Sequence, residues 1–316
     1  MAGAKSVLFV TGLCPEGCYY CPISPQRKGR DVTFVNEVPV SDVRDIVDEI
    51  AASMSEGVGV TGGEPMLVLD RVVTAIRVLK EVFGKDFHIH LYTSGTGVSR
   101  SSLERLVSAG LDELRVHVLS KLSLDAVKTA LEFPVDVVAE NPVIPGSSKW
   151  LVELITELDR LGVRYVNLNE LEVSELNADS LAMRGFKTSP NGRSVAGSRE
   201  TALTVLMWVE DEGLEISVHY CPAIYKDRHQ YPKRLNRRAT ATKRVFEEVE
   251  GGLVRWVELG HSGLARSLYL ADMAIKLGEV FAIHPRIGRE LRSGKVVEAL
   301  PLSPRKVLNE YEVSEE

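Results

Sequence analysis

Short apolar runs alternate with amphipathic runs over the first two-thirds of the chain. The apolar runs predict strands near residues 6–10, 58–61, 87–93, 112–118, 135–140, 163–169 and 214–220. The amphipathic runs predict helices near residues 40–55, 69–83, 99–109, 122–131, 148–161 and 199–211. Alternation with short connections predicts parallel strands joined by right-handed crossovers. The predicted fold class is therefore α/β, either a doubly wound sheet or a partial or complete β/α barrel.

The predicted strands carry their polar residues on one face. His88, His90 and Tyr92 alternate with apolar neighbours, and the strands near 112–118, 163–169 and 214–220 repeat this pattern. Parallel strands covered on both faces usually read as continuous apolar runs, and most β/α barrels fill the lumen with apolar residues. A barrel with outer helices and a polar, ligand-binding lumen accounts for the alternation. The alternative is an open sheet with one wet face.

Beyond Cys221 the chain changes character. A basic run occupies residues 226–244, and predicted strands at 252–259 and 279–284, a predicted helix at 262–277 and an apolar run near 295–302 follow it. The regular β-α alternation ends here, which indicates a smaller α+β extension. We predict two domains, a β/α barrel at residues 1–222 and an extension at 223–316 that is a candidate for substrate binding.

Composition excludes several classes of protein. The 316 residues are 44% hydrophobic and 26% charged, as in ordinary globular proteins rather than disordered chains. No apolar run approaches the roughly 18 residues that a membrane span needs, and the first residues lack the apolar core of a signal peptide. We therefore expect a cytoplasmic protein. The net charge of −6 argues against wholesale coating of nucleic acid.

The placement of the cysteines is more informative than their number. Four are too few for a disulfide scaffold in a chain of this length. Three of them form the pattern Cys14-x3-Cys18-x2-Cys21, directly after the first predicted strand. A zinc site needs a fourth ligand, which the local sequence lacks. A [4Fe–4S] cluster held by three cysteines leaves one iron open to another ligand.

Two motifs resemble those of the radical S-adenosylmethionine (SAM) enzymes. The first is the cysteine pattern, with Tyr20 before its last member, and the second is the segment Gly62-Gly63-Glu64-Pro65 after the second predicted strand. More narrowly, the chain resembles archaeal radical SAM proteins related to the pyruvate formate-lyase activating enzyme. That resemblance includes the segments Cys21-Pro-Ile-Ser, Arg27-Lys28-Gly29-Arg30, His88-Ile-His-Leu-Tyr-Thr and Val218-His-Tyr-Cys221. It implies a partial or near-complete TIM-like barrel. Activating enzymes usually lack a lobe like 223–316.

The resemblance also implies two cofactors and their sites. Cys14, Cys18 and Cys21 would ligate three irons of a [4Fe–4S] cluster, and SAM would chelate the fourth. The segment Gly62-Gly63-Glu64-Pro65 would receive the SAM amino group, because glycine lets backbone approach a ligand closely. Further expected contacts to SAM are Tyr20, Ser94, Arg115, His117, Glu140, Asn167 and Asn169. A reductant such as ferredoxin or flavodoxin would supply the electron that cleaves SAM to a 5′-deoxyadenosyl radical.

Several features leave the substrate open. Cys221 is a candidate catalytic residue at the barrel mouth, and the alternative is a thiol packed as a small apolar group. The basic run at 226–244 is a candidate contact to RNA or a phosphorylated metabolite, and the alternative is a solvated helix. Activation of a glycyl-radical partner protein is a further hypothesis. A non-catalytic Fe–S redox sensor would explain the cysteines but not the Gly62–Pro65 segment.

Overall fold

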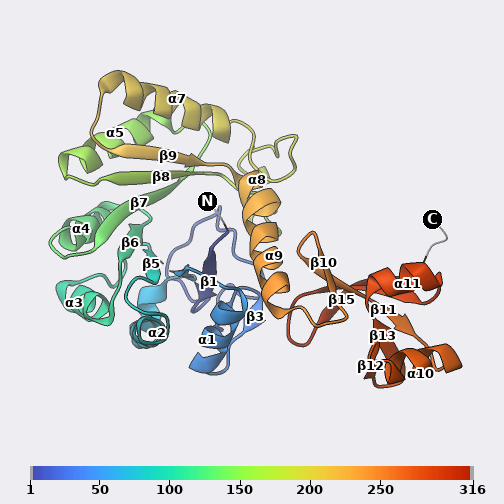
Figure 1. Ribbon diagram of the computed structural model, residues 1–316. Coiled ribbons are helices and arrows are strands. Elements are labelled where there is room, and N and C mark those ends of the chain that lie inside the picture. Colours follow the sequence, from blue (N-terminus) through green and yellow to red (C-terminus); the bar gives the residue numbers. More distant parts are fainter. Residues whose placement is uncertain (1–2, 314–316) are drawn as a thin grey trace. The chain divides into compact units, whose positions relative to one another are not determined.

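The computed structural model describes residues 3–313 and contains two compact units (Figure 1). One unit comprises Lys5–Glu49 and Glu56–Arg228. The other comprises residues 229–313 with the short stretches 3–4 and 50–55. The border expected between residues 222 and 223 stays a prediction, and the first unit ends at Arg228. Within the described residues, no helix has the length and apolar character needed to cross a membrane.

The first unit is built on a nine-stranded sheet whose strands follow one another in chain order. Its parallel strands are β1 (Lys5–Phe9), β4 (Gly57–Thr61), β5 (His88–Thr93), β6 (Glu113–Val116), β7 (Asp136–Val143), β8 (Tyr165–Glu170) and β9 (Ser217–Cys221). The short antiparallel strands β2 (Phe34–Val35) and β3 (Val38–Pro39) extend the sheet beyond β1. Because β3 and β9 end the sheet, the barrel is open.

Helices join the parallel strands and cover the outer face of the curved sheet (Figure 1). They are α1 (Val43–Ala52), α2 (Leu69–Phe83), α3 (Arg100–Ala109), α4 (Lys121–Ala130), α5 (Ser148–Arg160) and α7 (Ser198–Glu212), with the short η1 (Pro65–Val68) and α6 (Ala178–Ala182). Ser99 and Ser120 begin α3 and α4 with capping boxes. Gly110 ends α3 at φ +107°, a conformation that glycine adopts without strain.

The core of this unit lies between the sheet and the outer helices. Strand residues that are completely buried include Leu8, Val58, Val60, Ile89, Leu91 and Leu114. Helix residues buried to the same degree include Ile76, Leu103, Leu106, Ile155 and Leu158. Burial of each large side chain stabilises the fold by about 1.5–3 kcal/mol. The opposite face of the strands carries the polar residues, so the α/β class and the partial β/α barrel are both confirmed.

The second unit is an antiparallel sheet with two short helices. Its strands are β10 (Glu248–Glu250), β11 (Leu253–Leu259), β12 (Ala274–Leu277), β13 (Val280–Ile283), β14 (Lys295–Leu300) and β15 (Lys306–Glu312), in the order β12-β13-β11-β14-β15 with β10 paired to β11. Its two short helices are α10 (Gly263–Leu270) and α11 (Pro285–Leu291), and the longer α9 (Tyr231–Thr242) also belongs to this unit. Trp256, Phe281 and Val297 are among its buried residues.

One element of the second unit was predicted wrongly. The apolar pattern at 262–277 predicts one helix, but α10 ends at Leu270 and residues 274–277 form β12. Asp272 takes a left-handed conformation (φ +58°), which breaks the helix. Ala274 and Leu277 then pair with Ile283 and Val280 of β13. Tertiary strand pairing has overridden a local helical pattern.

The basic run is mostly helical. It spans the π-helical η2 (Lys226–Gln230), which follows the short α8 (Ala223–Tyr225), and α9 (Tyr231–Thr242). Several basic side chains of this run are buried or bonded to other residues of the protein. Arg238 is buried, Arg237 donates to the carbonyl oxygen of Met54, and Lys226 forms an ion pair with Glu172. The run is therefore not a uniformly solvated basic surface.

Candidate functional site

The three clustered cysteines lie in the loop between β1 and β2, where the first parallel strand ends. Cys14 is exposed, and Cys18 and Cys21 are half-buried. The Cys21 amide donates to the Cys18 carbonyl oxygen at 3.2 Å, which closes a tight turn between the two. Burial raises the pKa of the Cys14 and Cys18 thiols, and the neighbouring cysteines raise it further. Mutually interacting thiols on one short loop fit a shared iron–sulfur centre.

The Gly62–Gly63 turn touches the cysteine loop backbone to backbone. The Gly63 and Glu64 amides donate to the Thr11 and Leu13 carbonyl oxygens, each at 2.7 Å. A Cβ added to Gly63 would lie 2.3 Å from the Leu13 oxygen and 2.9 Å from Cys14 Cβ. Only glycine allows this approach. Because an ammonium group only donates hydrogen bonds, one arriving here would bind to carbonyl oxygens.

Glu64 fixes the turn to the end of β5. The residue is completely buried, and its Oε1 accepts from the Met66 amide at 3.0 Å and from Thr93 Oγ1 at 2.8 Å. Its Oε2 accepts from the Ser94 amide at 2.7 Å and from Ser94 Oγ at 2.6 Å. These four hydrogen bonds satisfy a buried carboxylate. Pro65 follows as the first residue of η1, where its missing amide costs nothing.

A clamp from α2 closes the base of the cysteine loop. Arg71 donates to both carboxylate oxygens of Asp31, at 2.7 and 3.0 Å, and to the Val10 carbonyl oxygen at 2.6 Å. Asp31 Oδ1 also accepts from Thr11 Oγ1 at 2.9 Å. These contacts join the first and last residues of the loop. The Arg71 guanidinium is also the main reason that the pKa of Asp31 is lowered.

The irregular stretch 171–197 packs against the other side of the cysteine loop. Buried Asn177 donates through Nδ2 to the Tyr20 and Glu172 carbonyl oxygens, each at 2.9 Å. Ser180 Oγ donates to the Tyr19 carbonyl oxygen. The Tyr19 ring stacks with Phe186, with the ring centroids 6.4 Å apart. The Ser- and Asn-rich stretch thus positions the backbone between Cys18 and Cys21.

Tyr20 and His117 connect the loop to the end of β6. Tyr20 Oη lies 3.3 Å from His117 Nε2. Burial lowers the pKa of His117 to about 4, so its imidazole is neutral near pH 7. Burial and the neighbouring Cys18 raise the pKa of the Tyr20 hydroxyl. The tautomer of the neutral imidazole sets which of the two groups donates.

Arg115 and Glu140 are the centre of a polar network on the inner face of the barrel. Arg115 pairs with Glu113 at 2.6 Å and with Glu140 at 3.3 Å. Glu140 Oε1 accepts from the side-chain amides of Asn167 and Asn169, at 2.8 and 2.7 Å. Both carboxylates help to raise the pKa of Arg115 against the effect of its burial. The buried Asn167 Oδ1 has no hydrogen-bond partner in the described part of the chain.

Cys221 ends β9 beside this network. The residue is 6% exposed, and Asn169 of β8 is its register partner. Burial raises the pKa of the Cys221 thiol, and the Lys226 ammonium opposes that shift. Lys226 pairs in turn with Glu172. A protonated thiol near Asn169 and Glu140 therefore borders the polar interior.

The structure brings the predicted site residues together in two connected groups. The cysteine loop contacts the segment 62–65, Glu64 contacts Ser94, and Tyr20 contacts His117. Arg115, Glu140, Asn167 and Asn169 form one hydrogen-bonded network. In the described part of the chain, no hydrogen bond or ion pair joins that network to Cys14, Cys18 or Cys21. Sequence reasoning missed Asp31, Arg71 and Asn177, because each acts through tertiary contacts that no local motif announces.

Comparisons with known proteins show the family of this chain. The sequence profile of the radical SAM superfamily matches residues 8–120, which include the cysteine loop and the Gly62–Pro65 segment. A protein of Methanocaldococcus jannaschii named "Putative glycyl-radical enzyme activating enzyme MJ0021" is 36% identical over 265 residues. That match covers 80% of this chain and 69% of the relative.

A solved structure supports the fold. Streptococcus suis SuiB bound to its precursor peptide SuiA matches with a TM-score of 0.50 and 12% identity, over 72% of this chain and 50% of SuiB. The chain thus spans about half the length of SuiB. Escherichia coli coproporphyrinogen III oxidase, HemN, matches over 99% of this chain and 73% of HemN at a TM-score of 0.43 and 8% identity.

The fold and the site define an iron–sulfur enzyme of the β/α-barrel class. The chain belongs to the radical SAM superfamily. Enzymes of this superfamily use a [4Fe–4S] cluster and SAM, which confirms both cofactors expected from the sequence.

Proposed function

We propose that this protein cleaves SAM reductively and uses the resulting radical to remove a hydrogen atom from a partner molecule. The main support is the contact between the cysteine loop and the Gly62–Gly63 turn. A Cβ placed on Gly63 would lie only 2.9 Å from Cys14 Cβ. Cys14, Cys18 and Cys21 hold the cluster, and the adjoining carbonyl oxygens receive the SAM ammonium. A small reductant of the ferredoxin or flavodoxin type supplies the electron.

When bound, the cluster supplies one electron to SAM, which yields methionine and a 5′-deoxyadenosyl radical. The chain's own residues orient and shield the reactants. Glu64 holds the Gly62–Gly63 turn through Ser94, and Asn177 holds the loop backbone at Tyr20. Tyr20 and His117 form the wall toward adenine. Arg115, Glu140, Asn167 and Asn169 present polar groups from the inner face to SAM.

The turn favours catalysis over a redox-sensor role. A sensor needs a cluster but no pocket beside it for an amino acid. Here two glycines and a buried, four-fold hydrogen-bonded carboxylate maintain a backbone segment directly against the cysteine loop. Glycine in an ordered segment costs conformational entropy, so its presence points to close approach of backbone or ligand. The segment therefore has a purpose that a sensor leaves unexplained.

For the target of the radical we propose a glycyl-radical partner protein. The support is the name of the 36%-identical relative, a glycyl-radical enzyme activating enzyme. RNA or a phosphorylated metabolite is less favoured than the sequence suggested, because Arg238 is buried and Lys226 is paired with Glu172. Electron paramagnetic resonance of a purified glycyl-radical enzyme, mixed anaerobically with reduced protein and SAM, tests this. A glycyl doublet supports a protein target.

The reductive cleavage itself is tested without any substrate. The protein is reconstituted anaerobically with iron and sulfide and then mixed with dithionite and SAM. We expect 5′-deoxyadenosine, detected by liquid chromatography and mass spectrometry. A fully loaded cluster that leaves SAM intact would rule out the proposed function. Salt-independent RNA affinity, or affinity unchanged when Arg237 and Arg238 are reversed in charge, would exclude RNA as the target.

A further inference from the structure

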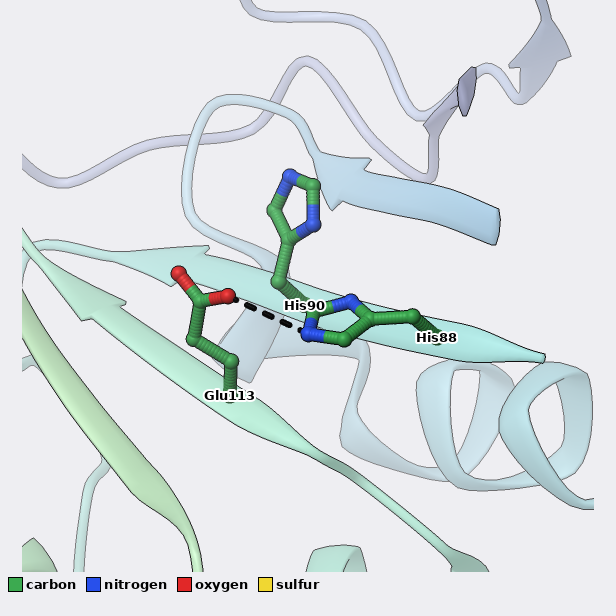
Figure 2. A group of neighbouring side chains, drawn as sticks. All are labelled: His88, His90 and Glu113. Carbon is green, nitrogen blue, oxygen red and sulfur yellow. Dashed lines mark ion pairs between the residues drawn. The ribbon is translucent and has the colours of Figure 1, made fainter. Parts of the chain in front are cut away.

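A second group of side chains of metal-binding types lies near the amino ends of two barrel strands, whereas the cysteine loop follows a carboxyl end. His88 and His90 come from β5 and Glu113 comes from β6, and Figure 2 shows the three together. His88 is the first residue of β5, and Glu113 is the first residue of β6. The cysteine loop instead follows the carboxyl end of β1. This cluster is therefore at the floor of the barrel, away from the end where β/α enzymes keep their chemistry.

The three side chains converge. One donor atom from each lies within 4.8 Å of the other two, and His88 Nε2 is 3.3 Å from Glu113 Oε2 (Figure 2). Donor atoms bound to a tetrahedral zinc ion at about 2.1 Å lie roughly 3.4 Å apart. Side-chain movements of about an ångström would therefore bring the three to bonding distance. His88 is 37% exposed, which gives an ion a path to the site.

Neighbouring residues support these ligands. Arg115 Nε donates to Glu113 Oε1 at 2.6 Å, which leaves Oε2 directed at His88. Outer partners that orient ligands in this way are typical of metal sites. Gly59 of β4 is the register partner of His90, and a Cβ there would lie 2.6 Å from His90 Nε2. Glycine weakens a strand, so its position here indicates that the imidazole needs the room.

The Lys5 ammonium lies on the Nδ1 side of both rings, whereas Glu113 lies beside Nε2 of His88. Lys5 Nζ lies 2.9 Å from His88 Nδ1 and 3.2 Å from His90 Nδ1, and it therefore donates to both rings. Both imidazoles accept a proton donor there, so both are in the neutral form that binds metals. Arg115, Glu113 and Asp112 are further charged groups near the cluster. A divalent ion bound to Glu113 and both rings would repel the Lys5 ammonium, whose flexible side chain can turn away.

We propose that His88, His90 and Glu113 bind a divalent transition-metal ion of the zinc type, in exchange with the Lys5 ammonium. Two imidazoles and one carboxylate form a ligand set that suits zinc, cobalt and ferrous iron. Bound at the first residues of β5 and β6, the ion would tie these strands together. Its role is structural, and it is independent of the cluster at the cysteine loop.

Cobalt is the probe for the test. The full-length chain carries Cys14→Ala, Cys18→Ala and Cys21→Ala, so that these thiols do not compete, and its fold is checked by circular dichroism. We expect Co2+ to bind with the visible absorption of nitrogen and oxygen ligation. His90→Asn abolishes the absorption. Lys5→Met increases the affinity at least tenfold, because the competing cation is gone. His219→Asn, an exposed histidine on β9, is the matched control and changes nothing.

A second measurement uses the cluster-loaded protein. After incubation with zinc and dialysis, the wild-type chain should retain one more zinc ion than His90→Asn, and its melting temperature should rise with zinc concentration, since binding stabilises the folded state. Equal zinc content in the two proteins would overturn the proposal. So would a Lys5→Met chain that binds no Co2+, or Co2+ absorption dominated by sulfur charge transfer that Cys221→Ala removes.

Discussion

The carboxylate of Glu64 accepts two hydrogen bonds from Ser94, one from the amide at 2.7 Å and one from Oγ at 2.6 Å. Glu64 belongs to the turn after β4, and Ser94 follows the end of β5. The pair therefore fixes the distance between two neighbouring strand ends at the candidate cofactor site. Both residues were predicted as SAM contacts. The structure adds that their side chains hold the Gly62–Gly63 backbone in place.

Glu64→Gln should destabilise the protein and weaken SAM binding. In either orientation the new side-chain NH2 would face one backbone amide, that of Ser94 or that of Met66, and this buried donor would lose its acceptor at a cost of about 1–3 kcal/mol. Urea unfolding and SAM titration of the cluster-loaded protein measure the two effects. Ser94→Ala, which keeps its backbone amide, should show a smaller loss of both. Equal SAM affinity in wild type and Glu64→Gln would show that the turn needs no such support.

Arg71→Met should lower the iron content of the reconstituted protein. The substitution removes the clamp between Asp31 and Val10 and lets the two ends of the cysteine loop separate. Iron and sulfide per chain, determined after anaerobic reconstitution, report the effect. Arg77→Met, at an exposed position on the same helix, is the control and should load fully. The same iron content in both variants would contradict a clamping role.

Asn177→Asp should also impair cluster loading. The new carboxylate would face the Tyr20 and Glu172 carbonyl oxygens in place of an amide donor, and two partly buried acceptors would lose their hydrogen bonds. We expect lower iron content and a chain less stable by about 1–3 kcal/mol. Asn191→Asp, in the exposed turn of the same stretch, provides the comparison. The account fails if the two variants behave alike.

His117 should make the cluster-free chain sensitive to acid. Its pKa is about 4 in the folded protein, against an ordinary value of 6.5. The unfolded chain therefore takes up the proton first, and stability is lost as the pH falls from about 6.5 to about 4. His117→Gln keeps an acceptor for Tyr20 but has no proton to gain. Urea unfolding at about pH 7 and pH 5 should show a smaller loss in this variant than in wild type.

Much of the barrel could be predicted from local pattern. The alternation of His88, His90 and Tyr92 with Ile89 and Leu91 correctly indicated one polar and one buried face, because side chains alternate along a strand. The predicted helix at 262–277 was wrong, because the pairing of residues 274–277 with β13 outweighed their helical spacing. The strand at 306–312 was not recognised, since all its residues are exposed and their pattern lacks a buried face.

The candidate site likewise contains residues that local motifs predicted and residues that they did not. Two local motifs could be recognised in the sequence, because the residues of each are close together in the chain. They are the cysteine pattern at Cys14, Cys18 and Cys21 and the Gly62–Gly63 turn. The partners that hold them are distant in the chain. Asn177 lies 157 positions from Tyr20, and Arg71 lies 40 positions from Asp31. Only the folded chain brings such pairs together, and no spacing rule announces them.

The central claim is that Cys14, Cys18 and Cys21 hold a cluster that cleaves SAM. The most direct measurement is 5′-deoxyadenosine formed by the reconstituted, dithionite-reduced protein, compared with Cys14→Ala and Cys221→Ala. We predict that wild type and Cys221→Ala form 5′-deoxyadenosine, because Cys221 lies at the end of β9 outside the cysteine loop, and that Cys14→Ala forms none. Equal product from Cys14→Ala and wild type would contradict the account.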